Sequence, residues 1–265
     1  MQLHSLAAKT VHDRRHGLVW WSVGMAVLTL VTLSVWPSVR DEYSKLLENY
    51  PKGLLAFFGI EQGSLGTASG YLQAELFGLM VPLTFTAYMI AAASGTIAGE
   101  EEAGTLGLLL AYPIARRRVV LEKFGALCGS LAVITVAFAC SLIVFTRVFA
   151  LHVAIGHLLE ATFAAYLLGV LYGAIALLAG VATGHRALAA GVASATAVAG
   201  YLLTSLAGLV DGLKPFRPLS PFWWYSGNNP LLHGLSAVHI SLLVATVVVS
   251  VAAGAFVFDR RDVAS

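Results

Sequence analysis

The stretch GEEEAGTLGLLLAYPIARRR, Gly99 to Arg118, gathers three consecutive glutamates and three consecutive arginines around a leucine-rich segment. The rest of the 265-residue chain is poor in charge, since Asp, Glu, Lys and Arg make up only 11% of it and hydrophobic residues 58%. Soluble domains carry about 25% charged residues. The contrast indicates that this stretch is a polar connection between segments that lie in a bilayer.

Charge-free windows flank the stretch and recur along the chain, and each exceeds the roughly 20 residues that a helix needs to cross the hydrocarbon core. A transmembrane β-barrel would instead show segments of about ten residues alternating between apolar and polar positions, a pattern that is absent here. We therefore predict an all-α membrane protein with one six-span domain over 17–265. The predicted spans are about 17–39, 76–98, 124–146, 161–184, 187–210 and 235–258.

Two further segments carry interfacial signals. Residues 1–16 place apolar side chains at helical spacing with basic groups opposite, which predicts an interfacial amphipathic helix, although a frayed basic tail is the alternative. Segment 211–234 holds four prolines and cannot form one regular helix. Its aromatic run SPFWWY, Ser220 to Tyr225, is typical of a membrane interface, so we expect short helices in the outer leaflet.

Basic residues set the expected orientation. With the N-terminus inside, the inner segments hold ten Lys and Arg residues and the outer segments six. The positive-inside rule then places both termini and the Gly99–Arg118 stretch in the cytoplasm.

The span interiors carry no Asp, Glu, Lys or Arg, whereas ion-coupled carriers usually need such groups. No phosphate-binding loop of the form G-x-x-x-x-G-K-[ST] occurs, so we expect that this chain does not hydrolyse ATP alone. Any driving energy must then arrive through a surface.

A protease is the alternative from another functional class. Ser94 in AASG, Ala92 to Gly95, and His239 in the last span resemble the serine and histidine of rhomboid intramembrane proteases. The first glycine of the rhomboid pattern is replaced by Ala92, and both residues are also ordinary packing residues.

The glutamate–arginine stretch predicts a helix that begins with its glutamates, because acidic side chains suit the positive end of the helix dipole. One stripe of this helix mixes charge with apolar groups and resembles a helix that enters a partner's groove. A second stripe, Ala103, Leu106 and Leu110, suits contact with the spans, and Pro113 ends the helix. The alternative is a solvated loop whose arginines fix the topology. The partner-facing stripe is Glu101, Thr105, Leu108 and Tyr112.

The same stretch resembles the first cytoplasmic loop of type 2 ABC-transporter permeases. The matching residues are Glu100 to Glu102, Gly104-Thr105-Leu106, Leu108 to Leu110, Pro113, Ala115, Arg116 and Lys123. Many members of the family have an acidic residue directly after Gly-Thr-Leu, where this chain has Gly107. SPFWWYSGNNPL (Ser220–Leu231) and FDRRDV (Phe258–Val263) extend the resemblance over almost the whole chain.

This resemblance implies the permease subunit of an exporter in a prokaryotic cytoplasmic membrane, moving a drug, an antibiotic or a lipid-like molecule. It implies two permease copies as a homodimer or heterodimer, two cytoplasmic ABC ATPase subunits that bind ATP and Mg, no cofactor in this chain, contact with lipid and no nucleic-acid partner. A non-transporting sensor or assembly subunit is the second alternative. The implied ATPase-coupling residues are Glu100, Glu101, Glu102, Gly104, Thr105, Leu106, Leu108, Tyr112, Arg116 and Arg117, and the implied pathway residues of spans two and five are Thr84, Thr86, Tyr88, Tyr201 and Ser205.

Overall fold

The computed structural model describes residues 15–48, 64, 66–107 and 115–261, and within these residues it is helical without strands. Six segments of this part are long and apolar enough to cross a membrane, which confirms the predicted fold class. The interfacial helix predicted over 1–16 lies outside the described residues except for its last two. The six candidate spans are His16–Arg40, Ala68–Glu102, Arg116–Val148, Ile155–Thr183, Arg186–Leu206 and Ala237–Arg260.

The first two spans depart from simple rods. Helix α2 (Arg15–Glu48) runs on through Pro37, beyond the predicted end of span one. The second span is a composite in which a short π-helix precedes α5 and a turn separates α5 from α6. Its parts are α4 (Ala68–Leu72), the π-helix η2 (Gln73–Phe77), α5 (Met80–Ser94) and α6 (Ala98–Glu102).

The later spans are single helices, and short elements join the last two of them. Spans three to six are α8 (Arg116–Val148), α9 (Ile155–Thr183), α10 (Arg186–Leu206) and α13 (Ala237–Arg260). The connection between α10 and α13 consists of the 3₁₀ element η3 (Asp211–Leu219), α11 (Pro221–Ser226) and α12 (Pro230–His233).

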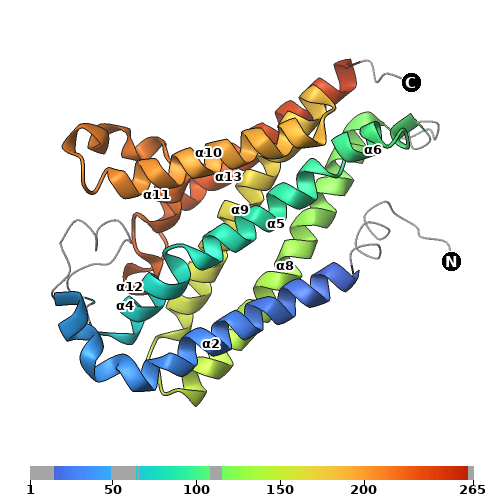
Figure 1. Ribbon diagram of the computed structural model, residues 1–265. Helices are drawn as coiled ribbons and strands as arrows, with labels where there is room; N and C mark the ends of the chain where they lie inside the picture. The colour runs from blue at the N-terminus through green and yellow to red at the C-terminus, as the bar shows by residue number, and fades with distance from the viewer. Residues whose placement is uncertain (1–14, 49–63, 65, 108–114, 262–265) are drawn as a thin grey trace.

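Helix α9 forms the centre of the bundle. It packs against α5, α8, α10 and α13, whereas α2 packs mainly on α8. Accordingly, 78% of the apolar window of α9 is buried, against 22% for the windows of α2 and α10. In Figure 1 the outer helices flank α9 with their axes running between two ends of the bundle. The apolar faces of α2 and α10 therefore remain for lipid or another protein.

Small residues on α9 permit the closest helix contact. A Cβ atom added at Gly169 would lie 3.2 Å from the Phe85 carbonyl carbon, and one at Gly173 would lie 3.1 Å from Met89 Cβ. Small residues let two membrane helices approach until their backbones touch, which maximises van der Waals contact where no hydrophobic effect acts. The glycine spacing thus fixes α5 against the central helix.

The two ends of the bundle differ in chemistry. One end, here called the charged end, carries α6, the start of α8 and the end of α13, and it lies at the upper right of Figure 1. The opposite end, here called the aromatic end, carries α4, α11 and α12. The glutamate–arginine stretch lies at the charged end.

Candidate functional site

The three glutamates of α6 point in three directions and each binds a different helix. Glu100 forms an ion pair with Lys123 of α8, whose side chain is only 5% exposed. The Lys123 ammonium also donates to the Thr96 carbonyl oxygen at 3.3 Å. This pair gives the buried lysine a counter-charge, and removing one partner of a buried ion pair costs several kcal/mol by order of magnitude.

Glu101 binds Arg261, which follows the last turn of α13. The arginine Nη1 and Nη2 atoms donate to the two carboxylate oxygens at 2.9 and 2.8 Å, and the Glu101 side chain is 12% exposed. Nη1 also donates to the Val181 carbonyl oxygen of α9 at 2.9 Å. One guanidinium therefore joins α6, α9 and α13.

Gly184 leaves the space that this ion pair occupies. It follows α9 in the left-handed conformation, with φ +70°, and an added Cβ atom would lie 2.9 Å from both Glu101 carboxylate oxygens. Glycine adopts this conformation without a Cβ clash, and it is the usual residue just after a helix. The site thus requires glycine for both conformation and space.

Glu102 binds the start of α10. Its Oε1 atom accepts a hydrogen bond from the backbone N–H of Arg186 at 2.9 Å, and His185 Nδ1 lies 3.7 Å from the same oxygen. The first N–H groups of a helix have no partner within it, and a carboxylate is favoured there. Glu102 therefore caps α10 from a different part of the chain.

The arginines of the stretch bind α13 and their own helix. Arg116 Nη1 donates to the carbonyl oxygens of Phe258 and Arg261, at 3.3 and 2.6 Å. Arg117 pairs with Asp259, and Arg118 pairs with Glu122 one turn along α8. The side chains of Arg117 and Arg118 are 65% and 73% exposed, so these two present positive charge outward.

The predicted continuous helix from Glu100 to Tyr112 is wrong. Helix α6 ends at Glu102, Gly104 has φ +68°, and the chain becomes helical again only at Leu106. Glycine is the residue that adopts positive φ most readily, so Gly104 breaks the expected stripe. Glu101 therefore binds Arg261 of its own chain and does not lie on one continuous helical stripe with Thr105.

The remaining predicted coupling residues divide between surface and core. Gly104 and Thr105 are exposed, and the Thr105 amide donates to the Glu100 carbonyl oxygen at 2.9 Å. Leu106 is 1% exposed and belongs to the core, in keeping with the expected contact with the spans. Leu108 and Tyr112 lie outside the described residues.

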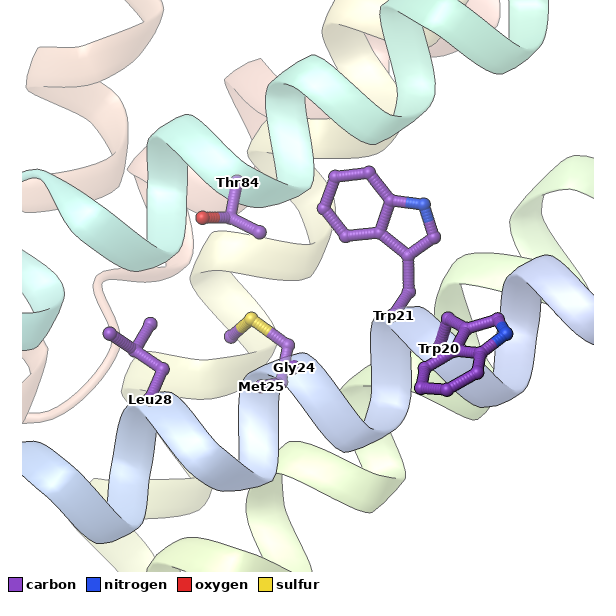
Figure 2. A pocket seen from close by; sticks show the side chains of 6 residues that line it. All are labelled: Trp20, Trp21, Gly24, Met25, Leu28 and Thr84. Atoms are coloured by element: carbon purple, nitrogen blue, oxygen red, sulfur yellow. The ribbon is translucent and has the colours of Figure 1, made fainter.

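The five predicted pathway residues occupy different environments. Thr86, Tyr88 and Ser205 are buried within the protomer, and Tyr201 packs edge-on against Phe222 with ring centroids 5.5 Å apart. Thr84 alone among them lines the groove described here, which lies between α2 and α5 and has a volume of about 290 Å³. Figure 2 shows side chains of α2 directed across this groove toward Thr84 of α5. The lining residues are Trp20, Trp21, Gly24, Met25, Leu28 and Thr84.

The protease alternative fails on geometry. Ser94 ends α5, seven residues from Glu101 at the charged end, and its hydroxyl donates to the Ala91 carbonyl oxygen at 3.3 Å. His239 lies in the first turn of α13 at the aromatic end, against Trp223. At 1.5 Å per residue, His239 and Arg261 are about 33 Å apart along α13, so Ser94 and His239 cannot share a proton. Within the described residues, no group of three His, Cys, Asp or Glu side chains is arranged to hold a metal ion.

Sequence reasoning missed the partners of the glutamates. The run FDRRDV contains Arg261, but neither this run nor the sequence around Gly184 indicates a contact with Glu101. Comparison with known protein families gives a match to the family described as "ABC-2 family transporter protein" over residues 4–263. Among curated proteins, none matches the sequence.

Proposed function

We propose, given that the chain belongs to the ABC-2 family of transporter proteins, that it is the permease of an ATP-driven exporter. Membership makes the chain a multi-pass membrane subunit of an ABC transporter that works with an ABC ATPase. The proposed cargo is an amphipathic small molecule, such as a drug, an antibiotic or a lipid-like compound. The proposed location is a prokaryotic cytoplasmic membrane, with both termini inside.

The observation that carries this proposal is the separation of charge from the membrane-spanning interior. The predicted spans have no charged residue at their centres, while α6 and the ends of α8, α10 and α13 meet in one charged cluster. Coupling ions or protons usually need ionisable groups within the membrane. A permease of this composition is suited to energy that arrives mechanically at its surface.

The proposed ATPase-docking surface is the exposed part of the charged end. At the charged end, Gly104, Thr105, Gly107, Arg117 and Arg118 are exposed. The glutamates of α6 and the two arginines are all paired within the protomer, so this surface presents balanced charges around an exposed turn of backbone to the ATPase. ATP and Mg would be held by the ATPase, two copies of which would serve two permease copies.

The proposed assembly is a homodimer in which α5 and α10 face the second copy. Helix α10 leaves Val192, Val198 and Leu202 exposed, and its apolar window is mostly unburied within the protomer. The groove between α2 and α5, with its single hydroxyl at Thr84, is the proposed membrane-side approach for an amphipathic cargo.

The test is ATP-dependent accumulation of a fluorescent amphipathic dye in inverted membrane vesicles that contain the chain and an ABC ATPase from the same genome. We expect accumulation that disappears when the phosphate-loop lysine of the ATPase is replaced. Dye movement that continues without ATP and stops when the proton gradient is removed would contradict the proposal. ATPase binding without transport of any amphipathic dye would favour the sensor or assembly role.

A further inference from the structure

We infer that the glutamates of α6 pass force from the ATPase to spans three, five and six, with the Glu101–Arg261 pair on Gly184 as the main junction. This inference rests on the proposed docking of an ATPase at the charged end. It assigns Glu101, Arg261 and Gly184 as positioning residues for energy coupling. In this arrangement α5, the helix that precedes α6 in sequence, is not the main route.

Helix geometry explains why three consecutive carboxylates reach three different helices. Successive residues of an α-helix are rotated by about 100°, so adjacent side chains project in separate directions. Glu100 meets Lys123 of α8, Glu101 meets Arg261 at the end of α13, and Glu102 meets the first amide of α10. A displacement of α6 therefore acts on three spans at once.

The helical backbone is interrupted on both sides of α6, so α6 is not part of one continuous helix. The turn Gly95–Ile97 lies between α5 and α6, and the left-handed Gly104 follows α6. The ends of α6 are thus not constrained by uninterrupted helical hydrogen bonding to α5. The contacts of its three carboxylates are all made to other spans.

Arg261 is the best-connected part of the cluster. Its guanidinium binds Glu101 and the Val181 carbonyl oxygen, and its own carbonyl oxygen accepts from Arg116 Nη1 at 2.6 Å. Consequently α6, α8 and α9 all bind the residue that follows α13. A two-point arginine–carboxylate pair fixes orientation as well as distance, and lysine cannot reproduce its planar fork.

The test uses the chain bound to its ABC ATPase in lipid nanodiscs, in a background with Cys128→Ser and Cys140→Ser. An environment-sensitive fluorophore attached to Val238→Cys reports on the far end of α13, where the native side chain is 67% exposed. The variants are Glu101→Gln, Arg261→Lys and the double variant Glu101→Gln/Arg261→Lys. The matched control is Lys214→Gln, which removes an exposed charge whose partner, Asp211, lies in the same short element η3, away from the charged end.

In Glu101→Gln and Arg261→Lys we expect normal ATPase binding and continued ATP hydrolysis. The fluorescence change produced by ATP and vanadate should fall by about tenfold, within the usual range of coupling between sites. The double variant should lose no more than the single variants, because residues of one network are not additive. Lys214→Gln should match the unsubstituted chain.

A full fluorescence change in both Glu101→Gln and Arg261→Lys would overturn the inference and leave the proposed function intact. Loss of ATPase binding in Glu101→Gln would also overturn it, since that result assigns Glu101 to docking. Failure of the unsubstituted chain to bind an ABC ATPase would refute the proposed function and this inference together. Thermal unfolding of each variant shows whether it has folded. If Glu101→Gln has not, Arg261→Lys still tests the inference, because it keeps the positive charge at position 261.

Discussion

Glu101 and Arg261 lie 160 residues apart in sequence and form a two-point ion pair, with both arginine Nη atoms within 2.9 Å of a carboxylate oxygen. The pair lies against Gly184, the residue that follows α9. The pair therefore joins α6, the end of α9 and the end of α13 at the charged end, although these segments are far apart in sequence.

Substitution of Gly184 should weaken the contacts that the Glu101–Arg261 pair makes between these segments. In Gly184→Ala the added Cβ atom meets the ion pair, and alanine must adopt φ +70°. We expect the free energy of unfolding to fall by about 1–3 kcal/mol, the usual cost of such strain. Thermal unfolding in detergent micelles measures the change.

Gly191→Ala is the matched control, since an added Cβ atom at Gly191 of α10 has no neighbour within 4 Å. We expect this variant to be as stable as the unsubstituted chain or slightly more so, because alanine favours helix over glycine. Equal stability of Gly184→Ala and Gly191→Ala would show that the pair moves aside without cost.

A buried serine should stabilise the aromatic end. The Ser220 hydroxyl donates to the Gly200 carbonyl oxygen and accepts from the Thr204 hydroxyl, both at 2.7 Å, and it caps α11 through the Phe222 amide at 3.1 Å. Ser220→Ala removes three buried hydrogen bonds and leaves the Phe222 amide without its cap, although the Thr204 hydroxyl still donates to the Gly200 carbonyl oxygen at 3.0 Å, so we expect a loss of about 1–3 kcal/mol in unfolding free energy. Ser226→Ala is the control, because that hydroxyl bonds only within its own helix. A loss equal to that of Ser226→Ala would contradict the role of Ser220.

Composition was sufficient to predict the number and class of the spans, because crossing the hydrocarbon core requires long charge-free helices. The same reasoning located the charged stretch but not its contacts. Glu101 on a helical wheel faces the same side as Thr105, and only the break at Gly104 turns the two apart. A single glycine in a leucine-rich run is compatible with a helix, so sequence alone does not distinguish the two outcomes.

The ion pairs were beyond sequence reasoning for a related reason. Lys123, Arg186 and Arg261 lie on three separate spans, and which of them meets which glutamate depends on how those spans pack around α9. Local sequence patterns indicate which face of a helix is apolar. They do not indicate which helices, distant in sequence, pack against that face.

The orientation of the bundle can be tested by labelling. In a chain with Cys128→Ser and Cys140→Ser, we expect Lys214→Cys to react with a membrane-impermeant maleimide on intact cells. Ala115→Cys at the charged end should react only after the membrane is permeabilised, as the excess of basic residues there predicts. Both native side chains are exposed, so access to reagent does not differ for reasons of burial. The reverse pattern would place the charged end outside the cell.

The proposed docking surface can be blocked without disturbing the fold. Gly107 is exposed, and an added Cβ atom there meets nothing within 4 Å, so Gly107→Trp should insert while projecting a large ring from the surface. If the ATPase docks there, the ring prevents close contact, and the dissociation constant should rise at least about tenfold, or 1.4 kcal/mol. Binding of the purified ATPase to the chain in nanodiscs measures the effect.

Gly212→Trp provides the matched control at the opposite end of the bundle. Gly212 is likewise exposed, with no neighbour within 4 Å of an added Cβ atom, and it lies in η3. This variant should bind the ATPase as the unsubstituted chain does, because the same ring then projects away from the docking surface. Weakened binding in both variants would indicate a general effect of the added tryptophan. Undiminished binding in Gly107→Trp would move the docking surface away from the exposed turn that follows α6.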